Sequence, residues 1–433
     1  MRKKLSMKAW LQFITCALGA FGIMYILFCR ASFYDAFIEA MSVTNTQFGV
    51  LYAVYGWIAV VGYLIGGFIA DKVSPRWLMF VSFLGTAICN FVLGLWPSYQ
   101  VCLVLYAVMG ITTTVTFWDT MLKCNRIFGR SIGDENRAFS WLQTVRGLGE
   151  MIISTFIVFL FTKFVDMVAG LRFVIWFYAG FLLLFAVISL FVFDDEVEED
   201  EKEASSGETI LSTESTLKQT IRLLKNPDLL LCVAIAFGGY NIGSCIGSYL
   251  GDMAGVFGAS VATIAYIGTM NAWLKPLGAF CGSFLVKKKG PTFCLEACTW
   301  IYMVILAVFI FLPKEGKYLP IFIALLAVEI ILTGLFRSQK FIQIREAGIP
   351  MQDTGNAFGI ISTIIYSADA FMPTFIGIWL DRMGEEGAYT RLYYILLASG
   401  VLTLAASIIF RRRNKTRIQQ LLMEDNEAAA GAE

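Results

Sequence analysis

The stretch GGFIADKVSPRW, residues 66–77, closes one long apolar run and opens the next. Its two adjacent glycines permit close packing between helices. Asp71 and Lys72 then introduce charge, Pro75 ends the turn, and Arg76 starts the following apolar run. Charges between two long apolar runs predict a short polar loop that joins two membrane-spanning helices.

Weaker copies of this helix ending recur along the chain. They read FTKFVDMVAGLRF (161–173), GSFLVKKKGP (282–291) and GIWLDRMG (377–384). Asp71 and Asp166 are 95 residues apart (166 − 71), and Val286 and Asp381 are also 95 apart (381 − 286). The four endings occur once in every three predicted helices and lie on alternate sides of the membrane. This arrangement is that of the inverted 3+3 repeats of secondary transporters. We therefore expect two six-helix bundles built from these repeats.

The composition is typical of a membrane protein. Of 433 residues, 58% are hydrophobic and 15% are charged, and the mean hydropathy is +0.69. A soluble chain carries about 25% charged residues, so this chain has too little polar surface for water and is predicted to lie in a bilayer. The net charge is +1 and no basic or aromatic motif stands out, so we expect no nucleic-acid partner.

Cysteine and histidine usage argues against metal and redox chemistry. The ten cysteines form no CxxC pair, most of them lie in apolar runs, and the chain has no histidine. The usual zinc and haem ligand sets are therefore missing, and no nucleophile–base arrangement stands out. We expect no cofactor, no bound metal and no enzymatic activity. Without histidine, any proton-coupled step must use carboxylates.

Twelve stretches have the length of about 20 apolar residues that a membrane helix needs. They cover residues 9–33, 46–70, 76–97, 99–122, 138–162, 171–193, 229–250, 260–285, 291–312, 318–336, 355–380 and 389–410. Lysine and arginine collect in alternate connections and near both ends of the chain, which predicts that both termini are cytoplasmic. The expected fold class is an all-α membrane protein with twelve transmembrane helices, located in the plasma membrane (the inner membrane of a bacterial cell).

The chain is predicted to divide into two membrane domains, residues 1–193 and 227–412. The segment between them, 194–226, begins with an acidic, Ser/Thr-rich run that cannot bury a core, so we expect a disordered cytoplasmic linker. Its end, LKQTIRLLKN (217–226), has the pattern of an amphipathic helix on the membrane surface. Residues 413–433 are predicted to form a cytoplasmic tail.

The loop that opens this section resembles a motif of the major facilitator superfamily. That motif is close to G-x-x-x-D-[RK]-x-x-x-R, and Gly67, Asp71, Lys72 and Arg76 satisfy it. AGLRFVIWF (169–177) is similar to the opening of the sixth helix in many members. The resemblance covers nearly the whole chain and implies two six-helix bundles that transport a small molecule.

Within that superfamily the chain looks most like the organophosphate:phosphate antiporters and the organic anion:cation symporters. YILFCRASF puts Arg30 where their first helix has a substrate-facing arginine, and residues 354–384 follow their pattern for helix 11. The phosphate-handling members carry a second arginine on helix 7, where this chain has the uncharged AFGGYNIGSCIGSYL (236–250). This departure favours carboxylates over phosphate esters as the transported anion.

Six ionisable residues are predicted to lie within the membrane. They are Arg30, Arg146, Glu150, Lys275, Glu329 and Asp369. Each costs at least ~2.5 kcal/mol to insert, so such residues mark transport pathways or pair with one another. Aligning Ala138 with Ala357 (offset 219) places Glu150 on Asp369, so two equivalent helices carry an acid at one depth.

The sequence predicts roles for these ionisable residues and for further polar and aromatic residues. The predicted substrate-binding residues are Arg30, Arg146, Lys275, Tyr34, Asn241 and Tyr366. The predicted proton-coupling residues are Glu150, Asp369 and Glu329. The predicted gating residues are Asp71, Lys72, Arg76, Asp119, Lys123 and Asp381. Purely structural roles stay open for several of these residues. Arg146 and Glu150, or Asp119 and Lys123, could form simple i, i+4 ion pairs. Lys275 could pair with a carboxylate, and the aromatic residues could serve in packing.

The sequence therefore predicts a monomeric secondary transporter that moves a small organic anion by rocker-switch alternating access, coupled to protons or to a second anion. A facilitator or exporter of another small solute, with its membrane charges mutually paired, is the main alternative. A transporter-like sensor that signals through residues 198–212 is the third, and it lacks a recognisable signalling domain.

Overall fold

The computed structural model describes residues 6–194, 213–350 and 353–430, and every regular element within these ranges is helical. The chain forms two compact units. Of the described residues, the first unit holds 6–194 together with the short segments 260–269 and 369–381, and the second unit holds the rest. The acidic linker predicted before residue 213 lies almost entirely outside the described residues.

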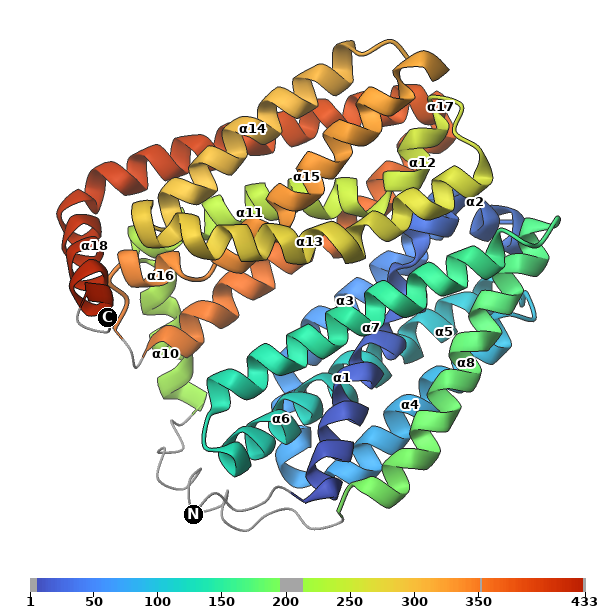
Figure 1. Ribbon diagram of the computed structural model, residues 1–433, viewed down its shortest axis with the longest axis horizontal. Coiled ribbons are helices and arrows are strands. Elements are labelled where there is room, and N and C mark those ends of the chain that lie inside the picture. The colour runs from blue at the N-terminus through green and yellow to red at the C-terminus, as the bar shows by residue number, and fades with distance from the viewer. Residues whose placement is uncertain (1–5, 195–212, 351–352, 431–433) are drawn as a thin grey trace. The chain divides into compact units, whose positions relative to one another are not determined.

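The first unit consists of long helices joined by short turns (Figure 1). Its elements are α1 (Met7–Phe28), α2 (Arg30–Met41), α3 (Asn45–Lys72), α4 (Pro75–Leu93), α5 (Tyr99–Gly110), η1 (Ile111–Trp118), α6 (Asp119–Ile132), α7 (Glu135–Phe161) and α8 (Met167–Val192). Local signals set several of the starts. Pro75 occupies the first turn of α4, and the side chains of Asp134 and Asp166 accept backbone N–H groups at the starts of α7 and α8.

The core of this unit is built from aromatic and aliphatic side chains of α1, α4, α6, α7 and α8. Phe83 of α4 lies fully buried between two other rings, with centroid distances of 5.3 Å to Phe117 and 5.8 Å to Phe185. At Gly66 of α3, an added Cβ would lie 2.3 Å from an Asp119 carboxylate oxygen. One of the two predicted packing glycines is therefore required for close approach, whereas Gly67 has open space around it.

An unusual element, η1, interrupts the helix that runs from Tyr99 to Ile132. It is a π-helix in the sequence ITTTVTFW. The hydroxyls of Thr113 and Thr114 each donate to a backbone carbonyl four residues earlier, both at 2.6 Å. Such bonds compete with the helical ladder and bend it, and π segments occur frequently at functional sites.

The second unit is also helical (Figure 1). Its elements are α10 (Thr213–Leu224), α11 (Pro227–Ser248), α12 (Leu250–Gly255), α13 (Val261–Lys289), α14 (Pro291–Phe311), η2 (Gly316–Tyr318), α15 (Leu319–Gln339), α16 (Gln343–Glu346), α17 (Thr354–Arg413) and α18 (Lys415–Ala430). Two of these, α13 and α17, each contribute one short segment to the first unit. Helix α17 is broken at Gly384, where φ is +68°.

Each of the twelve predicted spans overlaps a helix of the structure for most of its length, with two of them on α17, before and after Gly384. By length and apolar composition, nine helices of the described residues can cross a membrane, or ten when the bent α3 is counted as one span. The all-helical membrane fold is therefore confirmed, and the number twelve stays a prediction. Residues 415–430, predicted only as a tail, form the helix α18.

Candidate functional site

Arg30 is the first helical residue after a break between α1 and α2 at Cys29. Its side chain is buried, with 5% of the residue exposed, and its guanidinium carbon lies 4.1 Å from the ring centroid of Tyr52 on α3. A cation over a tyrosine ring gains about 2 kcal/mol when both groups are desolvated. The helix break thus directs a cation into the core of the first unit and against an aromatic face.

Tyr55 lies one helical turn beyond Tyr52 and connects further predicted site residues. Arg146 and Asp369 both lie close enough to the Tyr55 hydroxyl to interact with it electrostatically. The guanidinium of Arg146 lies 5.6 Å from the Trp118 ring at the end of η1. The first unit therefore gathers two predicted substrate residues and one predicted proton-coupling residue around the tyrosines of α3.

Glu150 interacts electrostatically with Tyr25 and Tyr178, whose rings stack at a centroid distance of 4.1 Å. Within the described residues, no ion pair joins Glu150 to Arg146, although they are one turn apart on α7. The interpretation of these two residues as a mutually neutralising pair is therefore not what the structure shows. Each acts on aromatic side chains instead.

The second unit contains a cation–tyrosine cluster of its own. Lys340, which directly follows α15, is only 4% exposed. Its ammonium group lies 4.7 Å from the ring centroids of both Tyr240 on α11 and Tyr366 on α17, and it donates a hydrogen bond of 3.2 Å to the Tyr366 hydroxyl. Arg337, three residues earlier, lies 5.2 Å from the Tyr240 ring.

Sequence reasoning missed Arg337 and Lys340 as site residues. Both were assigned to a polar connection, because the predicted apolar span ends at residue 336. Helix α15 continues to Gln339, so Arg337 lies in its last turn and Lys340 caps its end, and both meet tyrosines of neighbouring helices. Their i, i+3 spacing was the available signal, since it places both on one helix face. Tyr366, predicted to bind substrate, lies in this cluster.

Glu329 and Lys275 form a second polar group in this unit. Glu329 is 1% exposed and accepts a 2.8 Å hydrogen bond from the Thr333 hydroxyl, which in turn lies 2.9 Å from the Tyr302 hydroxyl. Lys275 acts electrostatically on Glu329. Helices α13 and α15 approach closely here, because an added Cβ at Gly334 would lie 2.0 Å from the Lys275 carbonyl oxygen. Pairing of Lys275 with a carboxylate and a substrate-binding role for Lys275 both stay predictions.

Two other predicted substrate residues make contacts elsewhere. The Asn241 amide donates to Ser399 at 3.3 Å and accepts a bond from Cys245. The Tyr34 hydroxyl donates to the Asn45 side chain at 2.9 Å. The Tyr34 ring also contacts Phe48, which in turn contacts Tyr52, so Tyr34 lies next to the aromatic group around Arg30. A substrate-binding role for Asn241 and Tyr34 stays a prediction.

The predicted gating residues of the 66–77 loop contact α6 and α8. Asp71 lies 3.7 Å from the ammonium group of Lys123, which also donates to the Ala70 carbonyl at 3.3 Å. Arg76 donates to the Phe193 carbonyl at 2.8 Å and so ties the start of α4 to the end of α8. Lys72 is exposed. Asp119, on the same helix as Lys123, packs against Gly66.

Asp381, the gating residue predicted from the fourth helix ending, lies at the start of α3. Its carboxylate accepts hydrogen bonds from the backbone N–H groups of Asn45 (3.0 Å) and Thr46 (2.8 Å) and from the Asn45 side chain (2.9 Å). All three residues belong to the first unit. Asp381 therefore satisfies N–H groups that a helix start leaves without partners.

Comparison with known proteins agrees with this arrangement of buried charges on long apolar helices. A family model described as the Major Facilitator Superfamily matches residues 10–344. The chain belongs to this superfamily. It is a multi-pass membrane protein of a family of small-molecule transporters, as the resemblance implied. No group of three or more potential metal ligands occurs in the residues that the structure describes.

The relatives of this superfamily member are distant but cover it almost completely. It is 24% identical to the inner membrane protein YihN of Escherichia coli K12 (96% of this chain, 99% of YihN) and 22% identical to YqcE of the same strain (93% and 95%). Among solved structures it resembles a variant of the nucleoside transporter NupG (TM-score 0.73, 13% identity, 93% and 99% covered). It also resembles an inward-facing bacterial homologue of the human lysosomal transporter Spinster (TM-score 0.66, 13% identity, 98% and 99% covered). These structural likenesses show the fold.

Proposed function

We propose that the chain is a secondary active transporter of a small organic anion, namely a carboxylate, a sugar acid or a phosphate ester. The observation that carries this proposal is the burial of Arg30 and Lys340, at 5% and 4% exposure, each against tyrosine rings. Burying a cation is costly, and cations buried within the helices of membrane proteins mark substrate pathways or pair with other groups. The family membership supports transport, and the sign of the charge supports an anionic cargo.

The surrounding rings make these cations suitable for reversible binding. Tyrosine faces offset part of the desolvation cost, so each cation remains stable when no anion is bound. A carboxylate or phosphate adds charge-assisted hydrogen bonds, which are roughly twice as strong as neutral ones. Arg146 and Lys275 are proposed as further anion contacts, and rocker-switch alternating access is proposed as the transport cycle.

Glu150, Glu329 and Asp369 are proposed as the proton-coupling groups. A charged carboxylate within the membrane costs free energy unless it is paired with a cation, and protonation removes this cost. Proton uptake at one of these positions would therefore accompany a change in its pairing. We further propose that the protein is a monomer in the inner membrane with both termini cytoplasmic, following the distribution of lysine and arginine.

The test is anion binding and transport by variants of the two buried cations. Arg30→Ala and Lys340→Ala should each abolish uptake into proteoliposomes and remove the thermal stabilisation that a panel of organic anions gives the purified protein. Arg30→Lys should retain part of both signals. Lys317→Ala is the matched control, because Lys317 is exposed and pairs only with the exposed Glu315 among the ion pairs of the described residues. Normal transport by a well-folded Arg30→Ala variant would overturn the proposal.

The alternative function is a facilitator or exporter of another small solute with its membrane charges mutually paired. The electrostatic contact of Lys275 with Glu329 favours this alternative. Counterflow in proteoliposomes with and without a pH gradient separates the two. Transport that ignores both the pH gradient and the charge of the solute would favour the facilitator.

A further inference from the structure

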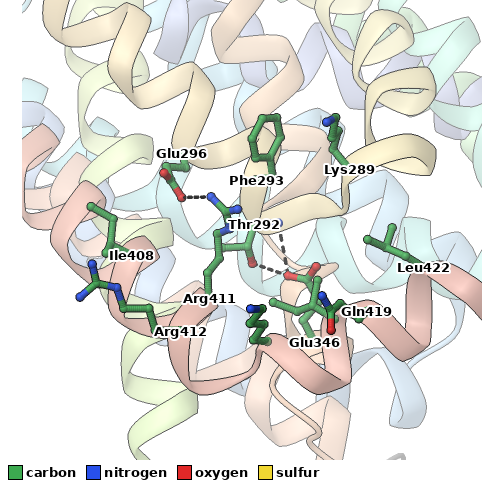
Figure 2. Close-up of a pocket in the computed structure, with 12 residues that line it drawn as sticks. Lys289, Thr292, Phe293, Glu296, Glu346, Ile408, Arg411, Arg412, Gln419 and Leu422 are labelled. Atoms are coloured by element: carbon green, nitrogen blue, oxygen red, sulfur yellow. Dashed lines mark hydrogen bonds and ion pairs between the residues drawn. The ribbon is translucent and has the colours of Figure 1, made fainter.

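The second unit contains a cavity of about 510 Å³ that the transport proposal does not use. It lies where the ends of α13 and α17 meet the starts of α14 and α18, with side chains of all four helices and of α16 around it (Figure 2). Its volume is within the range of small-molecule sites, roughly 300–1,000 Å³. None of the residues around it belongs to the candidate substrate site.

The cavity is electropositive. Its basic lining residues are Lys289, Arg411, Arg412 and Lys415, and its acidic lining residues are Glu296 and Glu346. Four positive charges against two negative charges leave an excess of two. Lys289 and Arg411 lie 5.6 Å and 5.2 Å from the centroid of the Phe293 ring, so one ring makes cation–π contacts with two of the cations.

Both acids already have partners within the protein. Glu296 accepts a hydrogen bond of 2.8 Å from Arg411. Glu346 accepts bonds from the hydroxyl and the backbone N–H of Thr292 at the start of α14, as the dashed lines of Figure 2 show. Gly290, with φ of +83°, permits this approach, because an added Cβ would lie 2.7 Å from the Glu346 carboxylate. Neither carboxylate therefore pairs with Arg412 or Lys415.

Two of the cations are available to a ligand. Arg412 and Lys415 are exposed, and within the described part of the chain neither has an ion-pair or hydrogen-bond partner. They lie on either side of Asn414, where α17 ends and α18 begins. Guanidinium and ammonium groups together form charge-assisted bonds to the several oxygens of a phosphate group.

The part of the cavity formed by α18 is partly apolar. Lys415, Ile418, Gln419 and Leu422 follow the i, i+3, i+4, i+7 spacing and therefore share one face of α18, and all four line the cavity. Ile408 adds a further apolar side chain from α17. A cationic wall beside an apolar strip suits an amphiphile with a charged head.

We propose that this cavity binds a phosphate group, carried by an anionic phospholipid or by a small soluble phosphate ester. The apolar strip of α18 favours the phospholipid. The ends of α13, α14 and α17 that form the cavity are those predicted to be cytoplasmic, and basic pockets between helices at that surface attract anionic headgroups. Binding there would hold α18 against the helix ends.

The probes are short-chain phosphatidylglycerol, short-chain phosphatidylcholine, glycerol 3-phosphate and inorganic phosphate, added to the full-length protein purified in a neutral detergent. Saturable binding of phosphatidylglycerol is expected, measured by thermal stabilisation and by native mass spectrometry. The double variant Arg412→Gln/Lys415→Gln should weaken it at least roughly tenfold, which corresponds to about 1.4 kcal/mol. This variant leaves the Arg411–Glu296 pair intact, so folding is preserved.

Controls separate this cavity from general surface charge and from the candidate transport site. Lys317→Gln removes an exposed cation beyond the other end of α14, and Arg30→Ala removes the buried one. Both should bind phosphatidylglycerol as the wild type does. Displacement of the lipid by glycerol 3-phosphate or inorganic phosphate at equal concentration would identify a soluble phosphate as the ligand. Equal binding of phosphatidylcholine, or equal binding by the double variant, would overturn the proposal.

Discussion

Asp71 and Asp381 belong to the helix endings that the sequence pattern predicts to be repeats, yet they have different partners. Asp71 is an exposed carboxylate, with 72% of its side chain accessible, that lies 3.7 Å from the ammonium group of Lys123. Asp381 accepts three hydrogen bonds of 2.8 to 3.0 Å from the start of α3. The same sequence signal thus yields a loose ion pair at one position and a shared helix cap at the other.

The start of α3 explains why Asp381 is expected to contribute more to stability than Asp71. Thr44 and Gln47 form a capping box that satisfies the backbone N–H groups of these two residues. Asp381 supplies the acceptors for the two N–H groups between them, those of Asn45 and Thr46. A capping carboxylate also interacts favourably with the positive end of the helix dipole. A repeated residue therefore acquires its role from the helix end that it meets.

The largest expected effect is that of Asp381→Ala. It removes the acceptor of two backbone N–H groups and of the Asn45 amide, so we expect a loss of roughly 1–2 kcal/mol, as for other helix caps. The measurement is the Tm of the purified protein in detergent. Asp381→Asn should recover part of the loss, because its amide oxygen still accepts a hydrogen bond. An unchanged Tm for Asp381→Ala would show that the cap is energetically neutral.

Asn45 offers an intermediate test, because its side chain links Tyr34 to Asp381. Asn45→Ala keeps both backbone bonds of the cap and should cost about 1 kcal/mol, the net value of a typical hydrogen bond. Asn45→Asp should cost more, because it places a second carboxylate beside Asp381. If Asn45→Asp were as stable as the wild type, the Asp381 carboxylate would not be charged in this contact.

Glu346 extends the comparison to a buried carboxylate that meets the start of α14. Burial raises the pKa of Glu346 above its ordinary value of 4.5, and the bonds from Thr292 and the charge of Arg411 oppose that shift. Because the pKa is higher in the folded state, the contribution of Glu346 is most favourable below the ordinary pKa and is lost as the pH rises through the folded value. We expect Tm to fall over this window in the wild type and to fall less in Glu346→Gln. Glu315→Gln, an exposed carboxylate, serves as the control and should leave the pH profile unchanged.

The smallest expected effect on stability is that of Asp71→Asn. Asp71 is exposed, and an ion pair with a solvent-exposed partner contributes about 0–1 kcal/mol. Lys123 is buried and keeps its bond to the Ala70 carbonyl. If the pair instead acts in gating, the variant should change the rate of transport more than the substrate concentration at half-maximal rate. An equal loss of apparent affinity would contradict a gating role for Asp71.

Much of the fold could be predicted from the sequence, because long apolar runs and the spacing of helix endings are strong local signals. Helix ends were less predictable, since hydropathy falls before the hydrogen-bonded helix stops. For this reason Arg337 and Lys340 were counted with a loop, whereas the structure places them against Tyr240 and Tyr366. The contact of Arg146 with Trp118, the residue just before α6, likewise depends on the packing of α7 beside α6, which spacing along one helix cannot show.

The π-helix Ile111–Trp118 has a consequence for the residues that follow it. If its hydrogen bonds changed to the α-helical pattern, every later residue of α6 would shift by one position, a rotation of roughly 100° about the helix axis. Trp118, which contacts Arg146, and Lys123, which contacts Asp71, would turn together. Such a change in the threonine-rich segment would couple the orientation of the Trp118 ring beside Arg146 to the ion pair of Lys123 with Asp71.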